Sequence, residues 1–375
     1  MRKNISVEFS EFLTELEVPE YHMMIHGTNP ALTFAEQVYN IKATFNDTIN
    51  YVVPGAVPVF CRFFLSDAAN QAQFIQEVFK DMPPCAMSMV QQPPLDGTKV
   101  ALWVYMLKDI EPSRSDDGMI TFSHNGYEHL WAAGIHGQNG SSEMQTLDIF
   151  NKYLDALSRN GCELASDCIR TWFFVQDVDV NYAGVVKARN DVFATQGLTK
   201  DTHFIASTGI GGGHADPEIS VQMDAYAVKG LKKEQIRYLY APTHLNPTYE
   251  YGVSFERGVC VDYGERRHVF ISGTASIDNK GKIVHPGDIR KQAERMIENV
   301  ETLLAEADCT FDDMGQMLIY LRDIADYSVV KDIYDKRFPN MPRVILLAPV
   351  CRPGWLIEME CMGVKFKTNH NFRDF

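Results

Sequence analysis

The chain has 375 residues, of which 45% are hydrophobic and 22% charged, and its formal net charge is -14. This length predicts two or three domains with sizeable cores. The acidic balance argues against a general nucleic-acid binder, because phosphate contacts need clustered Lys and Arg. No apolar run is long enough to span a membrane, and the start of the chain has no apolar signal segment. The eight cysteines include no CxxC pair, so we expect reduced thiols in a cytoplasmic protein.

The first part of the chain, residues 1–108, gives the weakest signals and is expected to be an N-terminal extension of uncertain structure. Weak strands are predicted within 52–64, a helix near 71–79 and an apolar strand over 100–106. The polar stretch 109–118 that follows is predicted to be a loop or linker.

One order of elements then occurs twice, first in 109–232 and again in 235–369. In both copies a strand is followed by a helix, a strand, a second helix and two closing strands. The predicted strands of the first copy are 129–135, 168–175, 203–207 and 220–228, and its second helix is 182–193. In the second copy the strands are 268–272, 317–321, 344–347 and 355–362, with helices from Asp288 and over 327–338. This repetition predicts an internal duplication, and the segment 65–67 with Phe79 repeats it weakly a third time.

The end of the second copy contains a candidate site. Residues 344–347 are apolar, 352–354 (Arg-Pro-Gly) are typical of a turn, and the residues from 355 to 362 alternate with period two. The alternation places Glu358 and Glu360 on one face of an otherwise apolar strand. We interpret the segment as a hairpin in which Arg343 and Glu358 meet across two neighbouring strands. An interstrand ion pair is the alternative interpretation.

The two copies differ at these charged positions. The matched pairs, aligned by eye, are His203 with Arg343, Gln222 with Glu358, and Asp224 with Glu360. The first copy therefore keeps the fold signal but loses the Arg and the Glu, which supports a site confined to the second copy.

Residues 235–369 resemble the RidA/YjgF (endoribonuclease L-PSP-like) family. The resemblance depends on the tyrosine-bearing segment around Tyr249, on Ser272-Gly273, and on Arg343 with Glu358 fifteen positions later. It implies a chorismate-mutase-like α+β fold, a homotrimer with sites between subunits, a carboxylate-binding role for Arg343 and a water-positioning role for Glu358. Ile345 stands where deaminases of the family usually have a cysteine.

The duplicated arrangement, with one degenerate copy, is similar to that of the chorismatases, which hydrolyse chorismate. The segments that carry this likeness are 272–277 (SGTASI), 285–288 (HPGD), 350–352 (VCR), 356–360 (LIEME), 254–257 (SFER) and 170–172 (RTW). The likeness implies cleavage of an enol-pyruvyl ether to pyruvate and a hydroxybenzoate or dihydrodiol. A cysteine at the place of Cys351 marks the chorismatases that form 3-hydroxybenzoate.

The chemistry of such a cleavage assigns roles to the candidate residues. Glu358, in a mostly apolar pocket, would have a raised pKa and serve as acid and base; a surface glutamate on an edge strand is the alternative. Arg343 would bind one substrate carboxylate by a bidentate contact, and Arg257 or Arg352 the second. Cys351 is a buried small hydrophobe, a nucleophile, or the product marker named above. The remaining expected substrate-binding residues are Tyr249, Ser272, Gly273, Thr274 and Glu360.

Three functions are therefore compared. The first is a hydrolase of chorismate or a similar cyclic acid, the second a RidA-type deaminase of 2-imino or enamine acids, and the third a non-catalytic module that binds small acids. The eleven histidines show no HExxH or paired spacing, so we expect neither metal nor cofactor. The expected partner is a small anionic carboxylic acid, with no nucleic acid and no membrane. The glycine-rich run 209–213 is not followed by a Gly-Lys-Ser/Thr and is predicted to be a flexible connection.

Overall fold

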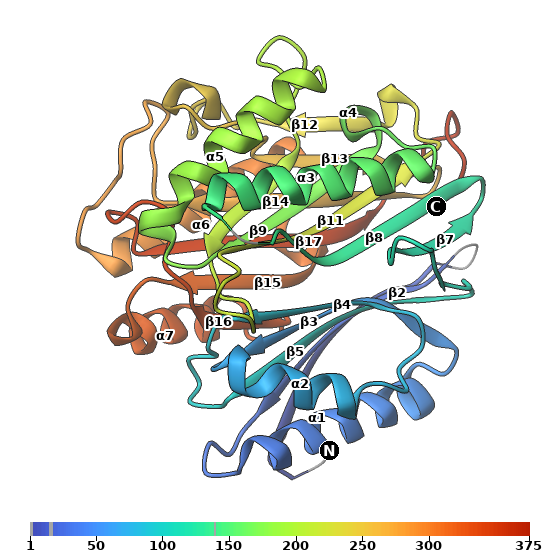
Figure 1. The fold of residues 1–375 in the computed structure, drawn as a ribbon, viewed down its shortest axis with the longest axis vertical. Helices are drawn as coiled ribbons and strands as arrows, with labels where there is room; N and C mark the ends of the chain where they lie inside the picture. Colours follow the sequence, from blue (N-terminus) through green and yellow to red (C-terminus); the bar gives the residue numbers. More distant parts are fainter. Residues whose placement is uncertain (1–2, 15–17, 139) are drawn as a thin grey trace.

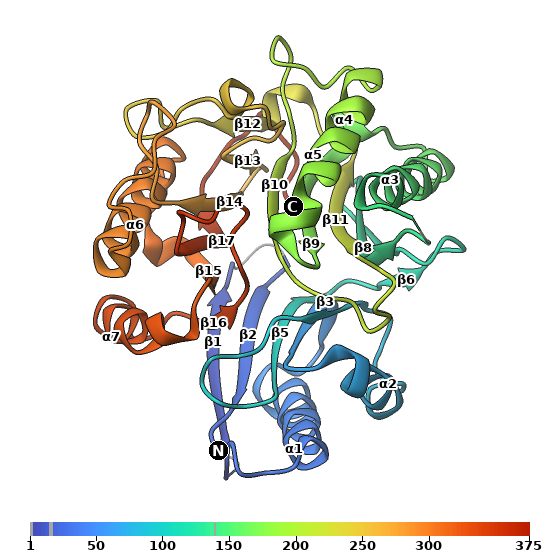
Figure 2. The ribbon, with the colours of Figure 1, turned by 60° about the vertical axis from the view of Figure 1, so that its left-hand side comes forward.

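The computed structural model describes residues 3–14, 18–138 and 140–375. The described strands form one sheet of five strands and two of six, and helices pack on one face of each sheet (Figure 1). The predicted α+β class is confirmed. Figure 2 shows the three sheets around a common centre, with their helices on the outside.

The last sheet, which with its helices we call module 3, has the strand order β12-β13-β14-β17-β15-β16. β16 pairs in parallel with β15, and β17 lies antiparallel between β14 and β15. The elements of module 3 are η2 (Lys233–Gln235), β12 (Ile236–Leu239), η3 (Thr248–Tyr251), β13 (Gly258–Asp262), β14 (Arg266–Ala275), α6 (Ile289–Glu306), η4 (Phe311–Asp313), β15 (Met314–Leu321), η5 (Ile324–Asp326), α7 (Tyr327–Arg337), β16 (Arg343–Leu347) and β17 (Ile357–Phe366).

The second sheet, in module 2, has the same order when it is followed from its other edge, β6-β7-β8-β11-β9-β10. Its parallel pair is β9 and β10, and β11 is inserted antiparallel beside β9. The elements of module 2 are β6 (Ser113–Arg114), β7 (Ile120–His124), β8 (Tyr127–His136), α3 (Ser142–Arg159), α4 (Leu164–Asp167), β9 (Cys168–Val175), α5 (Val178–Thr195), β10 (Ala206–Gly211) and β11 (Val221–Lys229).

The first sheet, in module 1, repeats this order without the outermost strand, β1-β2-β5-β3-β4, and β3 and β4 are its parallel pair. The elements of module 1 are β1 (Ile5–Phe12), β2 (Glu20–Gly27), α1 (Phe34–Asp47), η1 (Thr48–Val52), β3 (Ala56–Leu65), α2 (Ala68–Val78), β4 (Ala86–Gln91) and β5 (Val100–Lys108). Because the order matches, we propose that the expected N-terminal extension is a third copy of the module, with boundaries near residues 109 and 235.

Local sequence accounts for the helix that supports the candidate site. The side chain of Asp288 accepts a hydrogen bond from the backbone N–H of Lys291 at 3.1 Å, so the helix begins where an N-cap is available. One stripe of α6, which includes Ile297, Val300 and Leu304, is fully buried against the sheet of module 3. The helix therefore holds β14 and β17 in place from outside.

The three modules meet through their strands, and the first two of the three contacts use equivalent strands. β4 lies beside β8, β10 beside β14, and β15 beside β2, with isolated bridges from Gln91 to Gly213, from Ile210 to Val350 and from Pro94 to Leu346. These contacts close the ring within one chain. No helix among the described residues is long and apolar enough to cross a membrane.

The glycine-rich run is not a flexible connection, as the sequence had suggested. Residues 209–211 belong to β10, and the backbone of this run lies against the neighbouring modules. A Cβ atom on Gly211 would come within 2.8 Å of Cδ of Pro349, and one on Gly212 within 2.8 Å of Cγ2 of Val90. Glycine is therefore required here for close approach between modules rather than for mobility.

Candidate active site

The cleft between modules 2 and 3 combines side chains from both modules. β10 runs beside β14, and bridges join Ala206 to Glu256 and Ile210 to Val350. The residues that line the cleft and matter for its chemistry are Tyr182, Arg189, Ser207, Gly209, Tyr251, Phe255, Arg257, Gly273, Cys351, Arg352, Trp355 and Glu358. Three arginines, one from module 2 and two from module 3, and one carboxyl group thus line the same cleft.

Glu358 is the carboxyl group of this cleft. It lies on β17, opposite Ala275 of β14 and Tyr320 of β15, and is 5% exposed. Gly273 adjoins it so closely that a Cβ atom there would collide with Oε1 of Glu358. Burial, and secondly the charge of Glu360, raise the pKa of Glu358 to about 8. A carboxyl group of this kind is largely protonated at neutral pH and can donate a proton.

Glu360, two positions further along β17, does not line the cleft. It accepts hydrogen bonds from Nη2 of Arg170 at 2.7 Å, from Nε1 of Trp172 at 2.9 Å and from the hydroxyl of Tyr320 at 3.1 Å. The hydroxyl of Thr208 also donates to it, and accepts from the backbone N–H of Gly273 at 2.9 Å. Its expected contact with substrate stays a prediction, which this arrangement does not favour. Glu360 instead anchors β17 to module 2, because its partners fix the strand that carries Glu358.

Two arginines have unpaired nitrogens in the cleft. Arg189, on α5, is 1% exposed, and its Nε and one terminal nitrogen have no hydrogen-bond partner within the described structure. Arg257 is 4% exposed, its Nε is unpaired in the same sense, and its Nη2 is held by the backbone oxygen of Asn246 at 2.9 Å. Both guanidinium groups lie over the ring of Phe255, at 5.9 and 5.4 Å from its centroid. Since buried donors are nearly always paired, these groups indicate the place of an anion.

Cys351 and Arg352 form the part of the cleft contributed by the connection between β16 and β17. Burial, and then the nearby charge of Glu358, raise the pKa of Cys351 to about 12, so the thiol stays protonated at neutral pH. This disfavours a nucleophilic role, which requires the thiolate. Arg352 lies over the rings of Tyr251 and Trp355, at 4.4 and 4.8 Å from their centroids, and its guanidinium closes the cleft on that side.

Comparison with known proteins agrees with this architecture. The family description "Endoribonuclease L-PSP" matches residues 254–365. A RutC family protein of Pyrococcus abyssi is 30% identical over 99 residues, which make up 26% of this chain and 78% of that protein. The 3-aminoacrylate deaminase RutC of Acinetobacter baylyi is 30% identical over 93 residues, 24% of this chain and 74% of that protein. The chain belongs to the RidA/YjgF family.

The RidA/YjgF fold extends over most of the chain. A crystal structure of a chorismatase superposes with a TM-score of 0.65, covering 82% of this chain and 93% of that chain at 17% sequence identity. At this identity the likeness concerns the fold alone, but it includes the repeated arrangement of modules. The RidA/YjgF sheet of module 3 is thus one part of a larger ring.

Arg343, which was expected to bind a carboxylate, does not meet Glu358. β15 lies between β16 and β17, so the predicted hairpin of neighbouring strands is wrong. Arg343 donates to Oδ1 of Asp335 at 2.6 Å and to the backbone oxygen of Phe338 at 2.6 Å, and it lines a groove between modules 3 and 1 with Glu8. The alternation along 355–362 fixed the face of each side chain correctly, but it contains no information about which strand lies alongside.

The register of the parallel strands also corrects the match between the copies. Thr171 is paired with Ser207 and Met317 with Arg343, so Ser207 rather than His203 occupies the place of Arg343 in module 2. The matches of Gln222 with Glu358 and of Asp224 with Glu360 agree with the observed register, because β11 and β17 align with their neighbours in the same way.

The other predicted contacts lie around the cleft with different exposure. Ser272 is fully buried, where its hydroxyl donates to the backbone oxygen of Glu256 at 2.6 Å and accepts from the N–H of Ser207 at 2.9 Å. Thr274 is buried and donates to the backbone oxygen of Ser272. Tyr249 is 47% exposed and lines a separate pocket. Of the predicted residues, the cleft therefore brings together Arg257, Gly273, Cys351, Arg352 and Glu358.

The cleft includes residues that sequence reasoning did not assign to the site, among them two on α5. Arg189 and Tyr182 are on α5 of module 2, the copy judged degenerate, and Tyr182 packs so tightly on Gly209 that a Cβ there would lie 2.7 Å from its ring. Arg189 is a charged residue within the buried stripe of a helix, and this pattern in the sequence could have identified it as a site residue. No group of three or more potential metal ligands is present in the described parts of the chain.

Proposed function

We propose that the chain is a chorismatase-like hydrolase that cleaves the enol-pyruvyl ether of chorismate, or of a similar cyclic carboxylic acid. The observation that carries the proposal is the buried carboxyl group of Glu358 in one cleft with the unpaired guanidinium nitrogens of Arg189 and Arg257. Two guanidinium groups can each bind one carboxylate of a substrate that has two. A protonated carboxyl group in the same cleft can deliver the proton that cleavage of an enol ether requires.

The reaction follows from these positions. Glu358 donates its proton to the methylene carbon of the enol-pyruvyl group, and the positive charge develops on the ether carbon. Water adds to this carbon while the carboxylate of Glu358 takes a proton from the attacking water. The resulting hemiketal separates into pyruvate and the ring alcohol, which is a dihydrodiol. Where Cys351 directs the alternative outcome, the ring loses one hydroxyl group and one ring hydrogen as water and aromatises to a hydroxybenzoate, so that no net water is consumed.

A RidA-type deaminase of 2-imino or enamine acids is the second candidate. The 30% identity to a protein named 3-aminoacrylate deaminase favours it, and the same acid and arginines could bind an imino acid. A module that only binds small acids is the third candidate. The groove of Arg343 lends it little support, because that guanidinium is already held by Asp335 and two backbone oxygens.

Incubation with chorismate, with pyruvate release followed by a coupled assay, separates these candidates when 2-iminobutyrate hydrolysis is run in parallel. Pyruvate release above the spontaneous rate is the expected result. Consumption of the imine while chorismate survives would replace the proposal with the deaminase. If neither compound reacts but chorismate binds, the chain is a binding module.

The proposal also covers the oligomeric state of the chain and its cellular location. The three modules close a ring within one chain, so the homotrimer expected from the family would need an additional contact surface between chains; light scattering in solution measures this. All eight cysteines are free, which fits the cytoplasmic location predicted from the sequence.

A further inference from the structure

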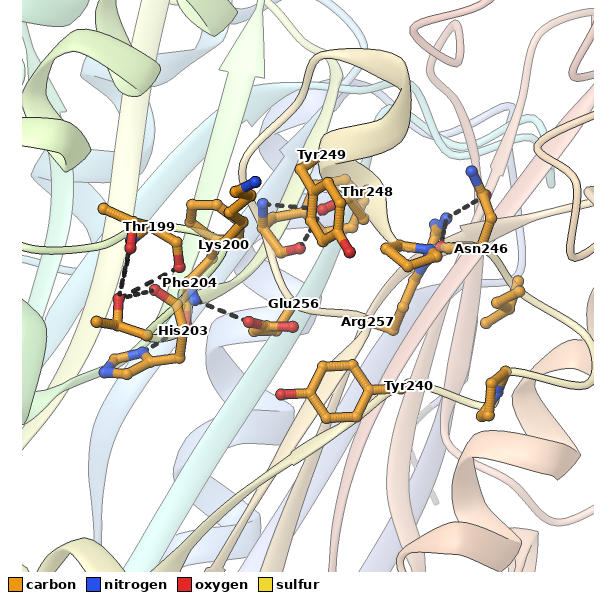
Figure 3. A pocket seen from close by; sticks show the side chains of 15 residues that line it. Thr199, Lys200, His203, Phe204, Tyr240, Asn246, Thr248, Tyr249, Glu256 and Arg257 are labelled. Carbon is orange, nitrogen blue, oxygen red and sulfur yellow. Dashed lines mark hydrogen bonds between the residues drawn. The ribbon is translucent and has the colours of Figure 1, made fainter.

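A second pocket adjoins the cleft on the other side of the segment 255–257. Phe255 and Arg257 line both spaces, whereas Glu358 lines only the cleft. Figure 3 shows this pocket between the segment around Lys200 and the loop that carries Tyr249. The two spaces thus share a wall but differ in their ionisable groups.

Glu256 is the buried acid of this pocket. It is 7% exposed, and its Oε1 accepts a hydrogen bond from the backbone N–H of Phe204 at 2.8 Å. Its other carboxyl oxygen has no hydrogen-bond partner among the residues that the structure describes, and the carboxyl group points into the pocket (Figure 3). Burial raises the pKa of Glu256. This second oxygen is not fully enclosed by protein, so a donor from a ligand in the pocket can reach it and form a hydrogen bond.

The walls of the pocket are aromatic and its rim is cationic. Phe204, Tyr240 and Tyr249 line it, and burial followed by the charge of Glu256 raises the pKa of Tyr240 to about 12. Lys200 is exposed at the rim, and no ion pair joins it to any described residue. The pocket therefore offers a buried hydrogen-bond acceptor at one point, flat apolar walls between, and an unpaired ammonium group at its mouth.

We propose that this pocket is a second binding site, for a small cyclic hydroxy acid. The ring would pack between the aromatic walls, its hydroxyl would donate to the free oxygen of Glu256, and its carboxylate would face Lys200. A primary amine is a poorer ligand, because Lys200 and Arg257 line the same space. A hydroxy acid is also what the proposed hydrolysis would release next door, but binding to this pocket does not require any turnover.

Calorimetric titration with 3-hydroxybenzoate and with benzoate, which lacks the hydroxyl, tests the proposal. Both are titrated into the full chain and into an Arg189→Met variant, which weakens any binding in the cleft. We expect the Arg189→Met protein to retain one site that binds 3-hydroxybenzoate about tenfold more tightly than benzoate, the size of one well-made hydrogen bond.

Two variants assign the site. Glu256→Met, checked for folding by circular dichroism, should remove the preference for the hydroxyl, and Lys200→Ser, at an exposed position, should weaken both acids about equally. Loss of all binding in Arg189→Met would place the ligand in the cleft and overturn the proposal. Unchanged affinity and unchanged hydroxyl preference in both Glu256→Met and Lys200→Ser would overturn it equally. Failure of chorismate turnover with these results intact would remove the proposed hydrolysis but leave the second site.

Discussion

Glu358 and Glu360 lie two residues apart on one face of β17, yet only Glu360 is surrounded by hydrogen-bond donors. These donors fix the carboxylate of Glu360 between modules 2 and 3. Its charge, added to burial, raises the pKa of its neighbour in the cleft. Two identical side chains thus have different roles because their surroundings differ, and neighbouring carboxyl groups with different environments are common in sites that use acid–base chemistry.

The pH dependence of turnover follows from the protonated state of Glu358. With a pKa of about 8, the acid form dominates at neutral pH and disappears above it. We expect kcat for pyruvate release to be level between about pH 6 and 7 and to fall about tenfold per pH unit above the pKa. The measurement is initial rate at saturating chorismate across this range. A rate that increases through pH 8 would assign the proton donor to another group.

The substitution Glu358→Gln should abolish turnover and preserve the fold. We expect kcat to fall by about 10²–10⁴-fold, the usual contribution of a general acid. The folded-state pKa exceeds the ordinary value of 4.5, so between these values the folded chain binds more protons, and its free energy of unfolding falls as pH rises. The amide of the Glu358→Gln variant does not titrate, so the variant does not lose unfolding free energy in this way. Urea unfolding should therefore show the variant more stable than the unmodified chain at pH 9, and a lower urea midpoint there would contradict the buried, neutral acid.

Substitution of two arginines distinguishes substrate binding in the cleft that contains Glu358 from substrate binding at Arg343. Arg189→Met removes an unpaired guanidinium from the cleft and should raise KM for chorismate by about 10–100-fold, as expected for one charge-assisted contact. Arg343→Met is the matched control, because its guanidinium binds Asp335 outside the cleft, and its KM should stay within about twofold. Steady-state kinetics of both variants give the two KM values and show which arginine binds the substrate. The reverse pattern would return the carboxylate-binding role to Arg343.

Sequence patterns predicted the faces of the strands better than their neighbours. The alternation along β17 placed both glutamates correctly on one face, since side-chain direction is local information. The pairing of Arg343 with Glu358 failed because β15 separates their strands. Counting along the chain also misplaced the equivalent of Arg343, because the connection before β10, residues 196–205, is longer than the connection before β16, residues 338–342.

Module 1 was difficult to recognise for a different reason. β3 and β5 are buried on both faces, since one face packs on α1 and α2 and the other on the centre of the ring. Strands covered on both sides lose the alternation of polar and apolar residues that identifies them. Module 1 also lacks a carboxylate at the place of Glu358, because Ala101 occupies the matching register position. Apart from the weak repeat at 65–67 with Phe79, neither periodicity nor chemistry therefore marked it as a copy.

The product depends on Cys351 under the proposed function. Cys351 lines the cleft with Glu358, and its thiol remains protonated at neutral pH. We expect Cys351→Ala to keep pyruvate release within about tenfold while shifting the ring product from hydroxybenzoate towards the dihydrodiol, because the thiol no longer adjoins the ring. Chromatography of the ring products measures this ratio. Cys361→Ala is the control, since Cys361 is buried outside the cleft; an equal shift in both variants would contradict a local role for Cys351.

The centre of the ring contains a buried ion pair whose loss should destabilise the whole chain. Arg62 of module 1 donates to Oδ2 of Asp224 in module 2 from Nε at 3.1 Å and from Nη2 at 2.8 Å, and both side chains are fully buried. Arg62→Met leaves Asp224 without its cation, so we expect the free energy of unfolding to fall by about 3–5 kcal/mol. The double variant Arg62→Met with Asp224→Leu should recover most of this loss, because it removes both charges.

The control is Arg337→Met, which breaks an exposed pair with Glu301 and should change the free energy of unfolding by at most about 1 kcal/mol. Urea unfolding of the three variants measures these differences, and a loss for Arg62→Met no larger than for Arg337→Met would show that the central pair does not hold the modules together.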